Sequence, residues 1–213
     1  MKKIGILWDL DGTLLNTLDD LADATNYALG RHGYPPRTID EVRRFVGNGA
    51  ARLIHLAVPE GEDPCPVLET FREYYEANCQ VKTRASDGIL DALAQVGQKY
   101  PMAIVSNKPD FAVKPLCKQY FGDIYALGES PDCPRKPAPD MVFKAMDAIG
   151  VDTCIYVGDS DVDVLTAKNA GVPCLSVLWG FRDRECITAA GGTHFCHEPK
   201  QLQTALDNIA NSL

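Results

Sequence analysis

The spacing of hydrophobic residues along the chain changes twice. Residues 4–8 are a short, continuous apolar run, which is typical of a buried strand. Between residues 17 and 80 the apolar positions recur at helical spacing, and no convincing strand appears. From residue 86 onward, helical segments alternate with short apolar runs. This pattern predicts an α/β protein in which a helical insertion separates the first strand from the rest of the sheet.

Four helices are expected in the insertion. The first begins after Thr17, which can act as its N-cap, and a turn rich in glycine and proline ends it. The second begins at Thr38, because Thr38-x-x-Glu41 is the pattern of a capping box. A Gly-Asn-Gly interruption at residues 47–49 precedes the third, and the fourth covers residues 67–78.

The second half of the chain predicts the rest of the sheet. Helices are expected over 87–99, 110–119, 139–149 and 161–169, and near 184 and 200; strands are expected over 102–105, 125–127, 154–157 and 173–178. Repeated strand–helix units favour a doubly wound parallel sheet with right-handed crossovers. We therefore predict an α/β core made of residues 1–15 and 85–213, and a helical cap over residues 16–84.

The net charge and the lengths of the apolar stretches limit the kinds of molecule that the protein is expected to bind. The 213 residues carry a formal net charge of -8 and contain no run of Lys and Arg, which argues against nucleic acid and anionic membrane surfaces. No apolar stretch approaches the ~20 residues of a membrane span, and the first strand begins almost at once. We expect a cytoplasmic protein, a monomer or homodimer, that acts on a small molecule.

Cysteine and histidine do not indicate a metal centre. The eight cysteines form no Cys-x-x-Cys pair, and several fall in apolar runs, so buried free thiols are expected. The segment His194-Phe195-Cys196-His197 is the one cluster that looks like ligands. A zinc site is not favoured there, because no second ligand cluster lies nearby in the sequence.

Polar clusters occur at the strand–helix junctions. Asp9 and Asp11 follow the first strand, Ser106-Asn107-Lys108 follows the second, and Gly158-Asp159-Ser160-Asp161-x-Asp163 follows the fourth. Arg135-Lys136-Pro137 lies between the third and fourth strands. Each cluster alone could be a turn, a solvated lysine or a helix cap. Parallel strands, however, end at one edge of the sheet, where such folds bind ligands, so the four clusters together predict one site.

The residue types in this predicted site favour phosphoryl transfer. Asp9, Asp11, Asp159 and Asp163 would repel one another unless a divalent cation neutralised them, and oxygen ligands without His or Cys favour Mg²⁺ over zinc. Lys136 and the Ser106 hydroxyl could hold phosphoryl oxygens. A carboxylate that attacks phosphorus needs a second carboxyl group to protonate the leaving alcohol, and Asp9 and Asp11 fit these two tasks.

These motifs, in this order, resemble the haloacid dehalogenase superfamily, in particular its phosphatases with a helical cap, over nearly the whole chain. The resemblance implies that Asp9 is the nucleophile and Asp11 the acid and base. It implies Mg²⁺ on the Asp9 side chain, the Asp11 main-chain carbonyl and Asp159, with Asp163 supporting the metal. The substrate-binding residues expected from the motifs are Gly12, Thr13, Ser106, Asn107 and Lys136. True dehalogenases of the superfamily lack the second aspartate, so Asp11 favours a phosphatase.

Three segments are similar to phosphoglycolate phosphatases, namely Leu14–Asp20, Phe45–Ala50 and Trp179–Arg182. The resemblance implies a small phosphorylated metabolite as substrate, with 2-phosphoglycolate favoured. It also implies that the Gly-Asn-Gly turn faces the site, where Arg44 or Arg52 could pair with a small carboxylate. Cap closure would gate access, with hinges near 15–17 and 82–86.

Three other functions remain open on the sequence. A sugar-phosphate mutase or an inorganic pyrophosphatase of the same superfamily would use the same site. A non-catalytic phospho-acceptor, of the kind found in response regulators, also has an acidic Mg²⁺ pocket with a Ser or Thr and a Lys. Such a receiver, however, has neither the long helical insertion nor an acid at the position of Asp11.

Overall fold

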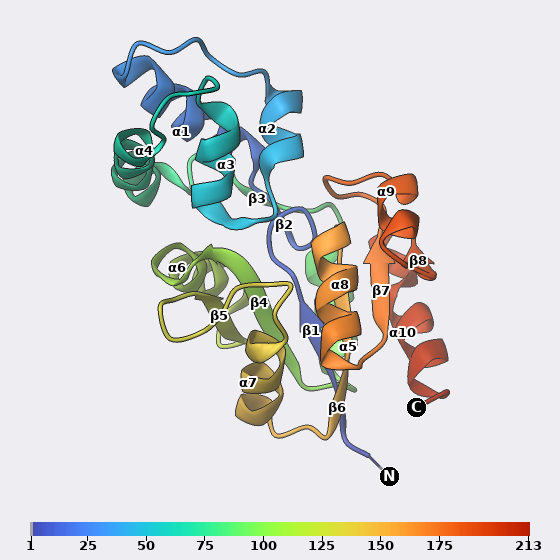
Figure 1. Ribbon diagram of the computed structural model, residues 1–213. Helices are drawn as coiled ribbons and strands as arrows, with labels where there is room; N and C mark the ends of the chain where they lie inside the picture. Colours follow the sequence, from blue (N-terminus) through green and yellow to red (C-terminus); the bar gives the residue numbers. More distant parts are fainter. Residues whose placement is uncertain (1) are drawn as a thin grey trace.

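The fold is a six-stranded parallel sheet covered by helices, with a separate group of four helices beyond one end of the sheet (Figure 1). The computed structural model describes residues 2–213. The strands lie in the order β5-β4-β1-β6-β7-β8, so the first strand is central. Their bounds are β1 Ile4–Trp8, β4 Met102–Pro109, β5 Tyr125–Glu129, β6 Thr153–Gly158, β7 Cys174–Val177 and β8 His194–Cys196. The predicted doubly wound α/β sheet is confirmed.

Helices pack on both faces of the sheet, and β1 shows why. Its side chains alternate, so that Ile6 and Trp8 enter one core while Leu7 enters the other. The first core includes side chains of α5 (Ile89–Gly97), α6 (Asp110–Phe121) and α10 (Leu202–Ala210); the second includes those of α7 (Asp140–Ile149) and α8 (Asp161–Ala170). The short helix α9 (Arg184–Ala189) and the 3-10 turn η1 (Pro199–Gln201) complete this part of the chain.

Four helices form a unit with a core of its own. They are α1 (Leu18–Arg31), α2 (Ile39–Phe45), α3 (Gly49–Ala57) and α4 (Cys65–Asn78), and we refer to them as the four-helix unit. Side chains from all four, among them Leu29, Ile54 and Phe71, make a third hydrophobic cluster. The capping box predicted at Thr38 is confirmed, with Glu41 N–H donating to the Thr38 hydroxyl at 3.3 Å. The unit lies beyond the carboxyl ends of β1 and β4 (Figure 1).

A two-stranded antiparallel ribbon joins the four-helix unit to the sheet. Leu15–Asn16 (β2) pairs with Arg84–Ala85 (β3), and the predicted division of the chain at 15/16 and 84/85 falls in this ribbon. The pairing was not foreseen, because strands of two residues carry no readable period. Asp20 in α1 supports the ribbon by accepting the main-chain N–H of Thr83 at 2.7 Å. The division into domains and the hinges stay predictions.

Within the main sheet, β4 and β8 differ most from the expectation. Strand β4 continues to Pro109 instead of ending at residue 105, so Ser106, Asn107 and Lys108 belong to the strand itself and are buried. The segment His194–Cys196, considered above only as a ligand cluster, is the edge strand β8. His194 is exposed at the start of this strand, and Cys196 is buried at its end. Within residues 2–213, no helix has the length and apolarity that crossing a membrane demands.

Candidate active site

Three carboxylates meet at the carboxyl edge of the sheet. Asp9 follows β1, Asp159 follows β6, and Asp163 lies in the first turn of α8. One carboxylate oxygen from each lies within 4.8 Å of the others, and their residues are 6%, 1% and 0% exposed. Among residues 2–213, these aspartates are the one group of three potential ligands brought so close together. We call them the acid trio.

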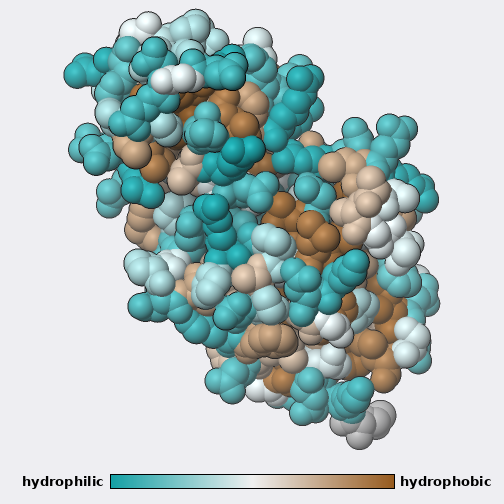
Figure 2. Space-filling view, viewed as in Figure 1, coloured by the Kyte–Doolittle hydropathy of each residue, from teal (hydrophilic) through white to brown (hydrophobic). Residues whose placement is uncertain are grey.

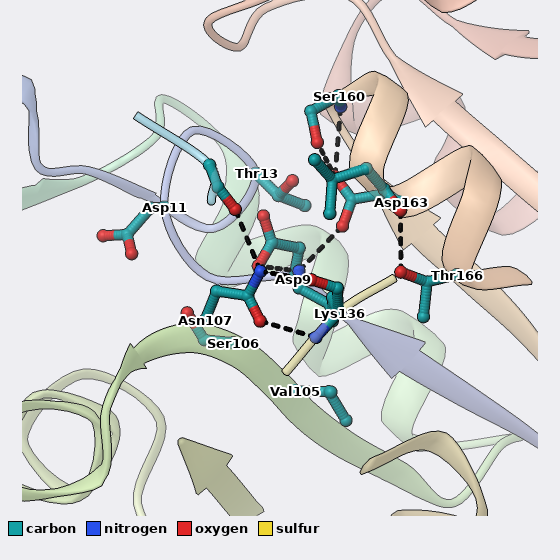
Figure 3. A network of polar contacts seen from close by, with 12 residues as sticks. Asp9, Asp11, Thr13, Val105, Ser106, Asn107, Lys136, Ser160, Asp163 and Thr166 are labelled. Atoms are coloured by element: carbon teal, nitrogen blue, oxygen red, sulfur yellow. Dashed lines mark hydrogen bonds and ion pairs between the residues drawn. The ribbon is translucent and has the colours of Figure 1, made fainter. Parts of the chain in front are cut away.

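Lys136 bridges two members of the acid trio. Its Nζ donates to Asp9 Oδ1 at 2.7 Å and to Asp163 Oδ1 at 2.8 Å, as Figure 3 shows. Asp163 also accepts the N–H and the hydroxyl of Ser160, at 3.1 and 2.6 Å, which fixes the start of α8. Burial works to lower the pKa of Lys136, but Asp163 and Asp9 outweigh it and hold this pKa well above its ordinary value.

The acid trio carries more negative charge than Lys136 neutralises. Burial raises the pKa of Asp9 well above its usual range, and the nearby Asp163 raises it further. Burial and Asp163 likewise raise the pKa of Asp159 to about 7, although the Phe181 N–H and the Thr13 hydroxyl hydrogen-bond to its carboxylate. Three buried carboxylates with one ammonium group are a donor set of oxygen atoms that suits a hard divalent cation such as Mg²⁺.

Asp11 is held apart from the acid trio. Its Oδ1 accepts the Thr17 hydroxyl at 2.6 Å and Lys108 Nζ at 2.7 Å. Thr17 therefore orients Asp11, and it makes no side-chain cap on α1, although it occupies the N-cap position as expected. Both donors use the same carboxylate oxygen, so Oδ2 has no recorded protein donor within residues 2–213. In Figure 3 the Asp11 carboxylate points away from the contact between Asp9 and Lys136.

The remaining predicted residues have different surroundings. Ser106 is 1% exposed and lines the same cavity as Asp9. Asn107 also lines it, but its amide group donates to the Gly47 and Lys136 carbonyls, each at 3.0 Å, and accepts the Lys136 N–H at 2.8 Å. Asn107 thus positions Lys136 and ties β4 to the four-helix unit.

Two of the predicted substrate-binding residues support the acid trio instead of lining the cavity. Thr13 is fully buried and donates to Asp159 Oδ1 at 3.0 Å. Gly12 has a φ of 87°, and a side chain there would overlap the Asp159 carboxylate. The loop after β1 can therefore approach Asp159 closely only with glycine at this position.

The structure does not bring Arg52 or Arg44 to the site. Both side chains are exposed, and neither residue lines the cavity. Helix α3 turns its apolar positions Leu53 and Ile54 into the core of the four-helix unit, which leaves Arg52 in solvent.

A small cavity of about 50 Å³ lies between the four-helix unit and the sheet edge. From the sheet side its walls include Asp9, Asp11, Ser106 and Asp159, and from the four-helix unit they include the apolar side chains Leu21, Leu53 and Phe71. On the visible face, Figure 2 shows hydrophilic residues gathered where the two parts meet. The cavity therefore has an acidic floor and a mainly apolar roof.

Known proteins with this arrangement can now be compared. The family model of the haloacid dehalogenase-like hydrolases matches residues 6–177. The chain belongs to this family. It is 36% identical to a phosphoglycolate phosphatase of Pseudomonas fluorescens, over 92% of this chain and 77% of the relative. It is 34% identical to a phosphoglycolate phosphatase of Agrobacterium fabrum, over 83% of this chain and 81% of the relative.

A solved structure agrees with these matches. A protein of Lactobacillus delbrueckii subsp. bulgaricus, provisionally named a phosphoglycolate phosphatase, superposes with a TM-score of 0.90 at 34% identity, over 97% of this chain and 99% of the other. The prediction of a phosphoglycolate phosphatase-like member of the superfamily, and of a phosphatase as its enzyme class, is confirmed.

Two cations of this haloacid dehalogenase-like hydrolase, Lys108 and Arg182, stood in segments quoted for the prediction but were assigned no task of their own. Lys108 pairs with Asp11, and it lies in the irregular end of β4, where no regular strand period could have indicated this contact. Arg182 donates to the carbonyls of Arg43, Arg44 and Val46 at 2.8, 3.2 and 2.5 Å. It satisfies carbonyls at the end of α2, so a loop of the sheet part holds the four-helix unit.

Gly180 gives a first testable prediction. A methyl group at this position would overlap both the Cβ and the carboxylate of Asp159. We expect Gly180→Ala to displace Asp159 and lower kcat/KM by about 10²-fold, since misplacing a group of the site by about 1 Å has effects of this size. Steady-state assays with a phosphomonoester check this.

The matched control is Gly30→Ala, because open space surrounds Gly30 in α1. Alanine is the better helix former, so this variant should keep wild-type kinetics and gain up to about 1 kcal/mol of stability. Equal kinetics for both variants would show that the close approach of Gly180 to Asp159 has no catalytic importance.

Proposed function

We propose that this protein is a Mg²⁺-dependent phosphatase of small phosphomonoesters, with 2-phosphoglycolate as the favoured substrate. The observation that carries the proposal is the separation of two carboxylates. Asp9 lies in the acid trio under Lys136, whereas Asp11 lies outside it and keeps one oxygen open. The names of the curated relatives support 2-phosphoglycolate. The cytoplasmic location and the monomeric or homodimeric state stay predictions.

In the proposed mechanism, Asp9 attacks the phosphorus atom and the bond to the leaving oxygen breaks. Asp11 donates a proton to that oxygen, which leaves as an alcohol, and the phosphoryl group remains on Asp9 as an aspartyl-phosphate. Asp11 then accepts a proton from a water molecule that attacks the same phosphorus, which releases phosphate and restores the Asp9 carboxylate. Lys136 and Ser106 bind phosphoryl oxygens in both steps.

The acid trio, with the Asp11 main-chain carbonyl, would hold Mg²⁺. When bound, the ion neutralises the carboxylates and the charge on the phosphoryl oxygens. Lys136 donates to both Asp9 and Asp163 and so holds these two side chains in line with each other.

Binding of Mg²⁺ can be tested on stability. A cation at about 100 times its dissociation constant stabilises the folded protein by about 3 kcal/mol, which corresponds to about 5–10 °C in Tm for a chain of this size. We expect millimolar Mg²⁺ to raise the Tm of metal-free protein by this amount, and Asp159→Asn to lose most of the shift. The control Asp147→Asn changes an exposed carboxylate of α7. An equal shift in Asp159→Asn and wild type would remove Asp159 as a ligand.

The reaction itself is tested by following free phosphate. Wild-type protein with Mg²⁺ should release phosphate from 2-phosphoglycolate over many turnovers. Isomerised sugar phosphate without free phosphate would instead indicate a mutase, and faster turnover of pyrophosphate would indicate a pyrophosphatase. Stable phosphorylation of the protein without turnover would indicate a phospho-acceptor.

A further inference from the structure

Lys108 has donor capacity that the protein does not use. Its side chain is 2% exposed, and its Nζ makes one recorded hydrogen bond within residues 2–213, to Asp11 Oδ1 at 2.7 Å. The ammonium group has three N–H donors; besides Asp11 it faces the Tyr75 hydroxyl, which leaves at least one donor without an acceptor among the described residues. Buried charged donors are normally satisfied, because an unsatisfied one costs considerable free energy. Lys108 lines the cavity, so a ligand there can reach it.

Tyr75 places a second unused donor in the same cavity. It comes from α4 of the four-helix unit and is 1% exposed, and its hydroxyl faces Lys108 but donates to no acceptor among the described residues. Lys108 Nζ lies 4.9 Å from the centre of the Tyr75 ring. Burial raises the pKa of Tyr75 above its ordinary value, although the charge of Lys108 opposes this, so the hydroxyl stays protonated and can donate. Both unused donors therefore lie at one end of the cavity, beside Asp11.

The other two cations of the cavity have different tasks, since the remaining donor of Lys136 is assigned to the phosphoryl group in the proposed function. Lys136 already donates to Asp9 and Asp163, and Arg182 donates to three main-chain carbonyls at the end of α2. An anionic group at the leaving-group end of a substrate would thus meet Lys108 as its cation. A neutral leaving group would leave two buried donors unpaired.

The position of Lys108 beside Asp11 indicates which part of a substrate it would meet. In the proposed function Asp11 protonates the ester oxygen, so this oxygen lies next to Asp11. In a phosphorylated 2-hydroxy acid, one carbon atom separates the ester oxygen from the carboxylate. A donor one hydrogen bond from Asp11 is therefore well placed for a carboxylate at that distance.

We propose that Lys108 and Tyr75 bind the carboxylate of the leaving group and select phosphorylated 2-hydroxy acids over neutral alkyl phosphates. This inference rests on the proposed function. It assigns specificity to one residue of the sheet and one residue of the four-helix unit, and to neither of the arginines expected from the sequence. Two charge-assisted hydrogen bonds to one carboxylate would supply the discrimination.

The test compares 2-phosphoglycolate with ethyl phosphate, which has a methyl group in place of the carboxylate. For wild type, kcat/KM should favour 2-phosphoglycolate by at least about 10²-fold, because each hydrogen bond to a charged group contributes about tenfold or more. Tyr75→Phe should reduce this ratio about 10-fold, mainly through KM for 2-phosphoglycolate, and should leave ethyl phosphate nearly unchanged. Tyr74→Phe is the matched control, since Tyr74 stacks on Tyr27 and does not line the cavity.

Lys108→Met provides a second measurement. This variant should hydrolyse both substrates more slowly, because Lys108 also holds Asp11. The ratio of kcat/KM for 2-phosphoglycolate to that for ethyl phosphate should nevertheless fall by at least about 10-fold. Inhibition by inorganic phosphate should be unchanged, whereas inhibition by glycolate should weaken. If wild type hydrolyses 2-phosphoglycolate, and Tyr75→Phe and Lys108→Met both keep the wild-type ratio of kcat/KM for the two esters, the inference is wrong and the proposed function stands. If wild type hydrolyses neither ester, the proposed function itself fails.

Discussion

Asp9→Asn is expected to lower release of phosphate from 2-phosphoglycolate by at least about 10³-fold, the scale on which loss of a nucleophile acts. The amide has the size of the carboxylate but cannot attack phosphorus. Lys136 keeps its contact with Asp163, so the surrounding structure should persist. Incubation of wild type with labelled substrate and rapid acid quenching should trap label on the protein, and the variant should show none.

The stability of Asp9→Asn should change with pH in a defined direction. Burial raises the pKa of Asp9 in the folded state, so the folded protein binds more protons than the unfolded chain at pH values between the ordinary and the raised pKa. Metal-free wild type should therefore lose stability as pH rises through this window, and the variant, which lacks the group, should lose less. Urea unfolding at several pH values measures this.

The control for Asp9→Asn is again Asp147→Asn, whose carboxylate is exposed on α7 and does not line the cavity. It should keep wild-type turnover and the wild-type pH profile of stability. Wild-type turnover in Asp9→Asn would remove Asp9 as the nucleophile.

Asp11→Asn should separate the two halves of the reaction. An aryl phosphate has a leaving group that needs no proton, so Asp9 can still be phosphorylated, whereas hydrolysis of the aspartyl-phosphate lacks its base. We expect one equivalent of phenolate in a burst, followed by turnover reduced by about 10³-fold. With 2-phosphoglycolate both steps need Asp11, so no burst is expected. The Mg²⁺-dependent rise in Tm should remain, because the main-chain carbonyl of residue 11 is retained.

Thr17→Val is a control for Asp11→Asn, in which Asp11 is retained but is held by fewer hydrogen bonds. It removes one of the two donors to Asp11 Oδ1 and leaves Lys108 in place. It should lower turnover modestly, by about 10-fold or less, and leave no burst. Equal turnover of both substrates by Asp11→Asn and wild type would mean that the acid and base lies elsewhere.

The sequence predicted the acid trio because Asp9 and Asp159 each directly follow a strand and Asp163 lies in the first turn of the next helix. Parallel strands end at one edge, so Asp9, Asp159 and Asp163 converge whatever the details of packing. Lys136 is less obvious, since it lies in a loop whose path depends on the hydrogen bonds of Asn107. The motif order located it, and the structure shows the contacts that hold it.

The end of the cavity beside Asp11 could not be predicted in the same way. Asp11, Tyr75 and Lys108 lie far apart in the sequence and come from a loop, a helix of the insertion and a strand. Their proximity depends on how the four-helix unit sits on the sheet, and no local period records that. Arg44 and Arg52 were predicted to bind a carboxylate because their charge can be read from the sequence. The direction in which Arg52 points depends on how α3 packs, and this cannot be read in the same way.

The ribbon of β2 and β3 allows the four-helix unit to be replaced without a change in the rest of the fold. Because the chain leaves the sheet at Leu15–Asn16 and returns beside it at Arg84–Ala85, the two ends of the insertion are already closed on each other. Lengthening or replacing what lies between them adds only a slowly growing loop entropy to the rest of the fold. Exchange of α4 would therefore give Lys108 a different partner, and under the proposed function it would change substrate choice while Asp9 stays in place.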